Sequence, residues 1–149
     1  MTLDSRLRHL YNITIDNRLK GGLVLHKIKK LPDAEFNVMK VVWANEPPIT
    51  ANIIMAEHGN AEGWKVQTAI VLLLRLVERG FLRTEKTGKE RTYFPMVNQE
   101  DYLRFETGNF IKQYHNNSLL NLVTAMYDDE ALTDDDIEGL RKLLKKRGE

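Results

Sequence analysis

The chain has 149 residues, no cysteine, 42% hydrophobic residues, and 22 Lys or Arg against 21 Asp or Glu. This size and composition indicate one ordinary globular domain, or a small domain with an appendage. The lack of cysteine excludes disulfides, thiolate metal sites and cysteine nucleophiles. No signal peptide precedes residue 31, so we expect a cytoplasmic protein.

The near-neutral total hides a charge gradient along the chain. Residues 1–30 carry seven Lys or Arg against two Asp or Glu, residues 31–97 carry eight of each, and residues 98–149 carry seven against 11. A basic start and an acidic end suit a nucleic-acid reader with a separate association module. An ordinary solvated surface is the alternative interpretation.

Residues 1–30 are predicted to be a basic N-terminal extension. The tripeptide KGG at 20–22 is what a purine-rich ribosome-binding sequence encodes when it is translated in frame, which makes Leu25 a candidate alternative start. A genuine flexible extension, or a helix from Leu3 to Tyr11 that packs elsewhere, are the other interpretations.

Two short helices are predicted after Leu31. The first begins at an Asp33 N-cap and ends before Pro47. Its apolar residues recur at three- and four-residue spacing: Phe36, Met39, Val42 and Trp43. The second follows Ile49, which suits a short extended piece, and is expected to run from a Thr50 N-cap to Gly59.

The stretch WKVQTAIVLLLRLVERG at 64–80 predicts a third helix that ends at Gly80. Its apolar run is too short to span a membrane, which takes about 20 residues. At 100° per residue, one face carries Ala69, Leu72, Leu73 and Leu76 and is predicted to point inward. The opposite face carries Gln67, Val71, Leu74 and Glu78, with Ile70 on one flank and Thr68 and Arg75 on the other.

After Gly80 the period changes to two, which predicts a β-hairpin that turns at Gly88 and Lys89. One side of the first strand carries Leu82, Thr84 and Lys86, and the second strand alternates around Thr92, Phe94 and Met96. Pro95 limits the second strand to an edge. Three helices and a hairpin over residues 31–97 predict a winged helix-turn-helix, a mainly α fold whose third helix enters the major groove.

Residues 98–149 are predicted to form three helices. A loose apolar stripe carries Tyr102, Phe105, Phe110 and Ile111, Ser118 is a candidate N-cap, and Thr133 with Asp136 suits a capping box. Three such helices are too few for a good core of their own. We therefore expect a dimerisation region that is completed by a second copy of the chain.

Three segments, LPDAEFNVMKVVWANEPPITANIIMAE, QTAIVLLLRLVERGFL and YFPMVNQEDYL, resemble the penicillinase repressor family, the BlaI and MecI type of bacterial transcriptional repressors. The resemblance covers about residues 31–146. It implies a homodimer that binds a palindromic double-stranded DNA operator of a beta-lactam resistance or cell-wall stress operon. In that family a membrane-embedded sensor protease typically triggers cleavage of the repressor, which releases the operator.

The match to the family is uneven along the third helix. Thr68 and Arg75 match family positions, whereas Lys65 stands where a serine is usual. Where the family commonly has a basic residue, a threonine and a polar residue, this chain has Ile70, Val71 and Leu74.

The cleavage site also departs from the family pattern. The usual Asn-Phe bond falls in register on Ala125 and Met126, and the Asn-Phe pair that does occur, at 109–110, lies one helix earlier. Proteolytic release at Ala125 and Met126 is therefore an open expectation.

Candidate DNA-binding residues follow from the third helix and the hairpin. Gln67 suits adenine, Arg75 suits guanine or a phosphate, and the apolar side chains suit thymine methyl groups. The cations suit phosphates, and Lys27, Lys29 and Lys30 add to them ahead of the first helix. The full set is Thr50, Lys65, Gln67, Thr68, Val71, Leu74, Arg75, Lys86, Lys89 and Arg91.

Other function classes find less support in the sequence. The four histidines are scattered, and the acidic runs lack the glycine and glutamate of a calcium loop. No nucleophile with a base and no phosphate loop can be assembled, so we expect no enzyme, metal, cofactor or small-molecule ligand. The alternative is a winged-helix interaction module that has lost DNA binding and docks a protein on its third helix. The apolar outer face of that helix could also be covered by the N-terminal extension or a partner, or reflect neutral drift.

Overall fold

The computed structural model describes residues 28–148. The chain divides between Phe105 and Glu106 into two compact units. The expectations about the N-terminal extension, the Leu25 start and the helix from Leu3 to Tyr11 lie outside the described residues.

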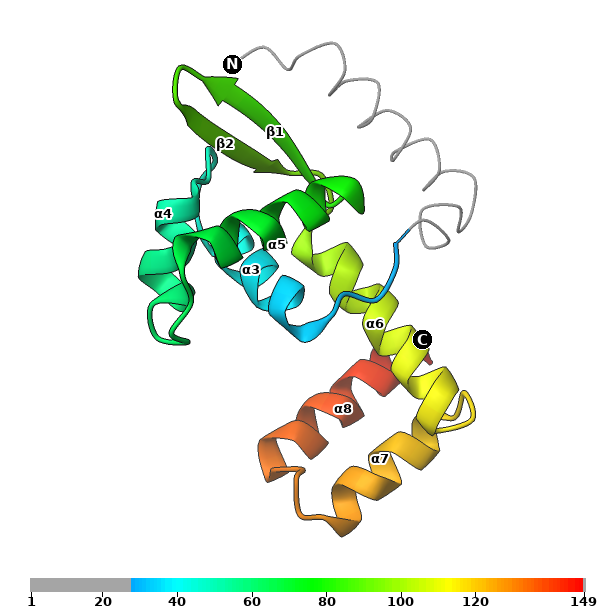
Figure 1. Cartoon of the computed structure of the whole chain (residues 1–149). Helices are drawn as coiled ribbons and strands as arrows, with labels where there is room; N and C mark the ends of the chain where they lie inside the picture. Colours follow the sequence, from blue (N-terminus) through cyan, green and yellow to red (C-terminus); the bar gives the residue numbers. More distant parts are fainter. Residues whose placement is uncertain (1–27, 149) are drawn as a thin grey trace. The chain divides into compact units, whose positions relative to one another are not determined.

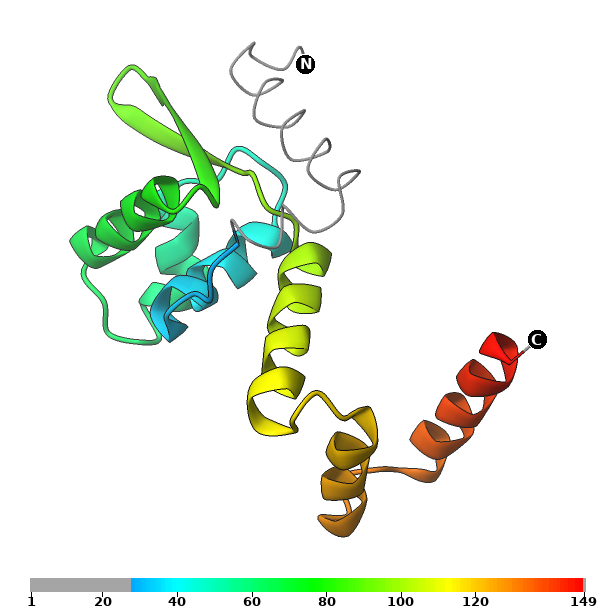
Figure 2. The ribbon, with the colours of Figure 1, turned by 90° about the vertical axis from the view of Figure 1, so that its right-hand side faces the viewer.

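The first unit has the predicted order of three helices and a hairpin (Figure 1). Its elements are α3 (Asp33–Ala44), α4 (Ala51–Ile54), the π-helical turn η1 (Met55–Gly59), α5 (Val66–Glu78), β1 (Leu82–Thr87) and β2 (Glu90–Pro95). The two strands pair antiparallel. Figure 2 shows the hairpin projecting beyond the helices. The predicted winged-helix fold, mainly α with a small β-hairpin, is confirmed.

Local sequence signals set most of the element boundaries. The Thr50 hydroxyl accepts the N–H of Ile53, as predicted for an N-cap. Gly80 follows α5 with a φ of +82°, a left-handed conformation that glycine adopts without a steric penalty. The predicted Asp33 cap is wrong, because α3 begins at Asp33 itself after Pro32, and no side chain caps it.

The core of this unit forms where α5 packs against α3 and the hairpin. The buried residues of α5 are those predicted to point inward, Ala69, Leu72, Leu73 and Leu76. They share one hydrophobic cluster with Val38, Met39, Val42, Ile49, Ile54, Phe81, Leu82 and Tyr93. Because this face is fixed inward, the opposite face of α5 must point to solvent.

The hairpin turns Tyr93 inward. The register pairs Leu82 with Pro95, Thr84 with Tyr93 and Lys86 with Arg91, and opposed residues lie on the same face of a sheet. Backbone hydrogen bonds of 2.8 and 2.9 Å also tie Tyr93 to Ile49, which confirms the short extended piece. Thr92 and Phe94 therefore lie on the opposite face of the hairpin from Tyr93. There the guanidinium of Arg83 lies over the Phe94 ring.

An ion pair between a buried carboxylate and an exposed guanidinium joins the start of α3 to the end of α5. Among residues 28–148, Glu35 is the one charged side chain that is buried. Its carboxylate accepts a hydrogen bond of 2.8 Å from Nε of Arg79. Since a buried charge is costly unless it is paired, this contact constrains how the two helices pack.

The first turns of α6 (Gln99–Tyr114) belong to the first unit through Tyr102. The Tyr102 hydroxyl accepts the backbone N–H of Leu31 at 2.9 Å. Its ring lies 5.6–6.3 Å, between centroids, from the rings of Phe36, Trp43, Phe81 and Phe105. This aromatic cluster joins the start of α3 to the segment that follows the hairpin.

The second unit contains the rest of α6, α7 (Leu119–Asp128) and α8 (Asp134–Arg147). The predicted caps are confirmed, since the Ser118 hydroxyl accepts the N–H of Asn121, and Thr133 and Asp136 form a capping box. The hydrogen bonds from Thr133 lower the pKa of the Asp136 carboxyl.

No residue of α7 or α8 is buried. Large apolar side chains of the unit are exposed: Phe110, Tyr114, Leu119, Leu120, Met126, Tyr127, Leu143 and Leu144. Within residues 28–148, no helix is both long enough and apolar enough to cross a membrane.

Replacing Arg79 with Met leaves the Glu35 carboxylate buried and unpaired, so we expect the free energy of unfolding to fall by about 1–3 kcal/mol. Urea titration followed by circular dichroism measures the change. The double variant Glu35→Gln and Arg79→Met should recover part of the loss, because no unpaired charge remains.

The control is Arg104→Met, which breaks the exposed pair between Arg104 and Glu100, 2.7 Å apart. We expect little change there, because solvent screens exposed pairs. An equal loss in both single variants would contradict a special role for the buried pair.

Candidate nucleic-acid interface

The outer face of α5 presents two parallel rows of side chains at four-residue spacing, the spacing at which residues are neighbours along a helix. One row is Val66, Ile70 and Leu74, and the other is Gln67, Val71 and Arg75. Val66, Val71 and Leu74 are exposed to 42%, 44% and 40%. The sequence had not singled out Val66, although its spacing from Ile70 and Leu74 was a usable signal.

The second row forms a shallow depression. Gln67, Thr68, Val71 and Arg75 line it together, with buried Leu72 at its base. Four of the predicted DNA-binding residues are therefore adjacent on one exposed surface. The depression offers an amide, a hydroxyl and a guanidinium around one aliphatic side chain.

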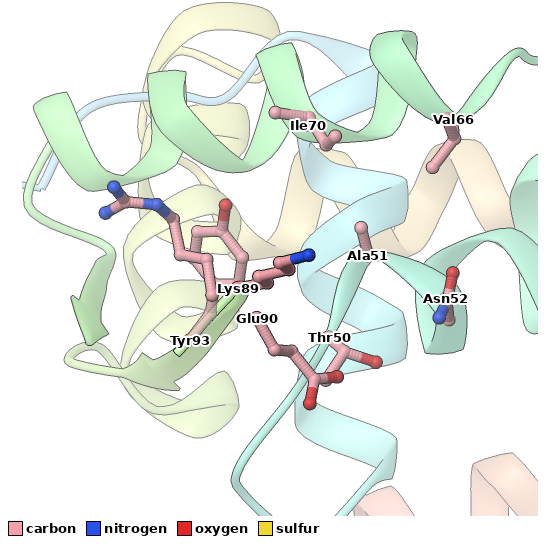
Figure 3. Close-up of a pocket in the computed structure, with 9 residues that line it drawn as sticks. Thr50, Ala51, Asn52, Val66, Ile70, Lys89, Glu90 and Tyr93 are labelled. Atoms are coloured by element: carbon pink, nitrogen blue, oxygen red, sulfur yellow. The ribbon is translucent and has the colours of Figure 1, made fainter. Parts of the chain in front are cut away.

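A second hollow, of about 300 Å³, lies between α5 and the hairpin (Figure 3). Thr50, Ala51 and Asn52 line it from the start of α4, Val66 and Ile70 from α5, and Lys89, Glu90, Arg91 and Tyr93 from the hairpin. Ile70 is only half-exposed. One of the three unexpected apolar residues thus forms a wall between the helix and the wing.

Tyr93 is a functional candidate that the sequence did not single out. The residue is 1% exposed, yet it lines the hollow. Burial raises the pKa of Tyr93, and the nearby charge of Arg91 opposes that shift. The hydroxyl therefore stays protonated at neutral pH and can donate a hydrogen bond to an acceptor in the hollow.

The wing concentrates positive charge. Lys86 and Arg91 are directly opposed across the hairpin, and both are exposed. Like charges in that position repel each other, which a bound anion would relieve. Lys89 extends the cationic surface into the turn, while Glu90 supplies one opposing charge at the hollow.

The remaining predicted residues lie apart from both depressions. Lys65 is exposed at the start of α5, and its side chain makes no capping hydrogen bond, as expected for a poor cap. Leu74 and Lys86 line neither depression but are exposed on α5 and β1. Ala125 and Met126 lie in the second unit, exposed on α7. Within residues 28–148, no three His, Asp or Glu side chains are grouped so that they could hold a metal ion.

Residues 31–146 match the model of the penicillinase repressor family. This match covers well over half of the chain. The chain belongs to the penicillinase repressor family. The resemblance inferred from the sequence motifs is therefore confirmed.

Two relatives are similar to this chain over nearly their whole length. The penicillinase repressor of Bacillus licheniformis is 29% identical over 122 residues, which are 82% of this chain and 94% of that protein. The methicillin resistance regulatory protein MecI of Staphylococcus aureus strain N315 is 30% identical over 82% of this chain and 98% of its own.

Among solved structures, the monomeric form of Bacillus licheniformis BlaI in complex with the blaP half-operator is 35% identical. It covers 50% of this chain and 90% of its own, with a TM-score of 0.43.

Substitution of two adjacent leucines tests which face of α5 is exposed to solvent. Leu73 is fully buried and Leu74 is 40% exposed. We expect Leu73→Ala to lower the free energy of unfolding by about 2–5 kcal/mol, and Leu74→Ala to change it by less than about 0.5 kcal/mol. Urea titration of the two variants measures both values. A large loss in the Leu74 variant would mean that this face is covered.

Proposed function

We propose that this chain is a transcriptional repressor that binds a double-stranded DNA operator as a homodimer. The observation that carries the proposal is the exposed face of α5, whose side chains are suited to reading bases, together with the cations of the hairpin. An α-helix with such side chains fits the major groove of B-DNA. Membership of a family named for repressors supports the same conclusion.

Each candidate side chain has a role that follows from its chemistry. Gln67 and Arg75 can make bidentate contacts to adenine and guanine. Lys65, Lys86, Lys89 and Arg91 suit phosphates, because salt-dependent phosphate contacts supply most nonspecific affinity. The hydroxyls of Thr50 and Tyr93 can donate hydrogen bonds beside the cations of the wing. The hydroxyl of Thr68 can do so at the depression on α5.

The homodimer is proposed from the second unit. In our proposal residues 31–97 bind DNA, residues 98–149 associate with a second copy, and residues 1–30 form a basic extension. The exposed leucines and aromatic rings of α6, α7 and α8 support this division, because an apolar surface of this extent is typical of an interface.

The regulated genes are proposed from the relatives. One is named a penicillinase repressor and the other a methicillin resistance regulatory protein, so we propose an operon of beta-lactam resistance or cell-wall stress. We propose no enzymatic activity. A protein-docking module without DNA binding is less well supported, since it would not require opposed cations on the wing.

Release by a membrane-embedded sensor protease is proposed from the register of the sequence alone. The candidate bond between Ala125 and Met126 lies inside α7, where the Ala125 carbonyl accepts the N–H of Asp129 and the Met126 carbonyl accepts that of Ala131. Cleavage there would require the last turn of the helix to unwind. Neither residue supplies the Asn-Phe pair of the family pattern.

The DNA-binding proposal predicts two different losses of affinity for the region upstream of the protein's own gene. Arg75→Ala should weaken specific binding by about 1–3 kcal/mol if the contact is bidentate. Arg91→Gln should weaken binding to specific and unrelated duplexes alike, and lower the slope of log affinity against log salt by about 1. Fluorescence anisotropy at several salt concentrations measures both.

Arg104→Gln is the matched control, because it removes an exposed cation of α6 that lies outside the proposed interface. It should leave affinity and salt slope unchanged. Unchanged binding in the Arg75 and Arg91 variants, or an equal loss in all three, would contradict the proposed interface.

The dimer proposal predicts that Leu120→Asp yields monomers. Leu120 is 76% exposed on α7, and a charge there would be costly to bury between two copies. Sedimentation equilibrium measures the mass, and anisotropy on a full operator should show weaker binding. Gln113→Asp, at an exposed polar position of α6, is the control and should remain dimeric. A dimeric Leu120 variant would exclude this surface as the interface.

A further inference from the structure

We propose that Val71, supported by Leu74, reads the 5-methyl group of a thymine in the operator half-site, between the bases that Gln67 and Arg75 contact. The inference rests on the proposed DNA-binding function and extends it to a specificity that apolar side chains provide. It separates Val71 and Leu74 from Ile70, which the structure places in the wall of the hollow.

The side chains of Val71 and Leu74 are exposed to solvent, and the inference starts from this exposure. Val71 and Leu74 are 44% and 40% exposed on a helix whose inward face is already complete with four buried residues. Packing in the core therefore does not explain why these two residues are aliphatic. Covering such side chains with another apolar group is favourable in proportion to the area removed from water.

The neighbours of Val71 indicate which apolar group covers it. One helical turn away on either side lie Gln67 and Arg75, and Thr68 completes the depression. An amide, a guanidinium and a hydroxyl suit the edges of bases in the major groove. On those edges the thymine methyl is the apolar group, so it is the natural partner for an aliphatic side chain set among polar ones.

The spacing along α5 fixes where that thymine lies. Eight residues from Gln67 to Arg75 span about 12 Å of helix, which corresponds to three or four base-pair steps of about 3.4 Å. Val71 is at the midpoint of this span. The expected thymine therefore falls inside a window of about four or five base pairs whose two end pairs are contacted by Gln67 and Arg75.

Removing one methyl group at a time from the DNA tests the proposal. The full chain is bound to its own upstream region, the half-site is located by footprinting, and each thymine is replaced singly by deoxyuridine, which lacks only the methyl. We expect one or two replacements inside the window to lower affinity about three- to fivefold, the size expected for one buried methyl group. Thymines outside the window should respond less than twofold.

Protein variants complete a double-mutant cycle. In Val71→Ala the same deoxyuridine replacement should have little effect, because the protein side of the contact is already gone. Leu74→Ala should reduce the effect in part. Leu103→Ala, at a 43% exposed leucine of α6, is the control and should leave the effect intact.

Three outcomes would overturn the inference, and they differ in what they leave standing. Specific binding that no deoxyuridine replacement weakens, or a loss that persists in Val71→Ala, would refute methyl reading while leaving the repressor function standing. Binding that shows no preference for any duplex would refute both, and would assign Val71 and Leu74 to a protein-docking surface instead.

Discussion

The burial of one face of α5 is the constraint on which the rest of the first unit depends. Ala69, Leu72, Leu73 and Leu76 fill the space between α3 and the hairpin, so the rotation of α5 about its axis is fixed. The ion pair of Glu35 with Arg79 holds the end of the same helix, because an unpaired buried carboxylate would be costly. Which side chains meet solvent is therefore a consequence of packing.

The exposed surface that results combines two kinds of chemistry. On α5, polar side chains at helical spacing surround an aliphatic one, and on the wing, like charges oppose each other across the hairpin. Both arrangements carry a cost in the free chain, from exposed apolar area and from charge repulsion. The proposed partner, an anionic and methyl-bearing DNA duplex, would relieve both.

The second unit follows a different principle. Its helices are well specified locally, with hydrogen-bonded caps at Ser118 and Thr133, yet α7 and α8 bury no residue. Local signals thus determine where these helices start, while their apolar residues remain without a core within the unit. Association with a second copy, as proposed, would supply the missing burial and present two winged helices to one operator.

The sequence alone determined the order of elements, the inward face of α5, most caps and the family, because periodicity, glycine positions and motif order are local signals. Only the tertiary structure decided that Tyr93 faces inward and that Ile70 lines a hollow, because strand register and the approach of the hairpin to α5 depend on contacts distant in sequence. It also showed that no side chain caps α3. Glu35 pairs with Arg79, 44 residues away, and no local pattern specifies that contact.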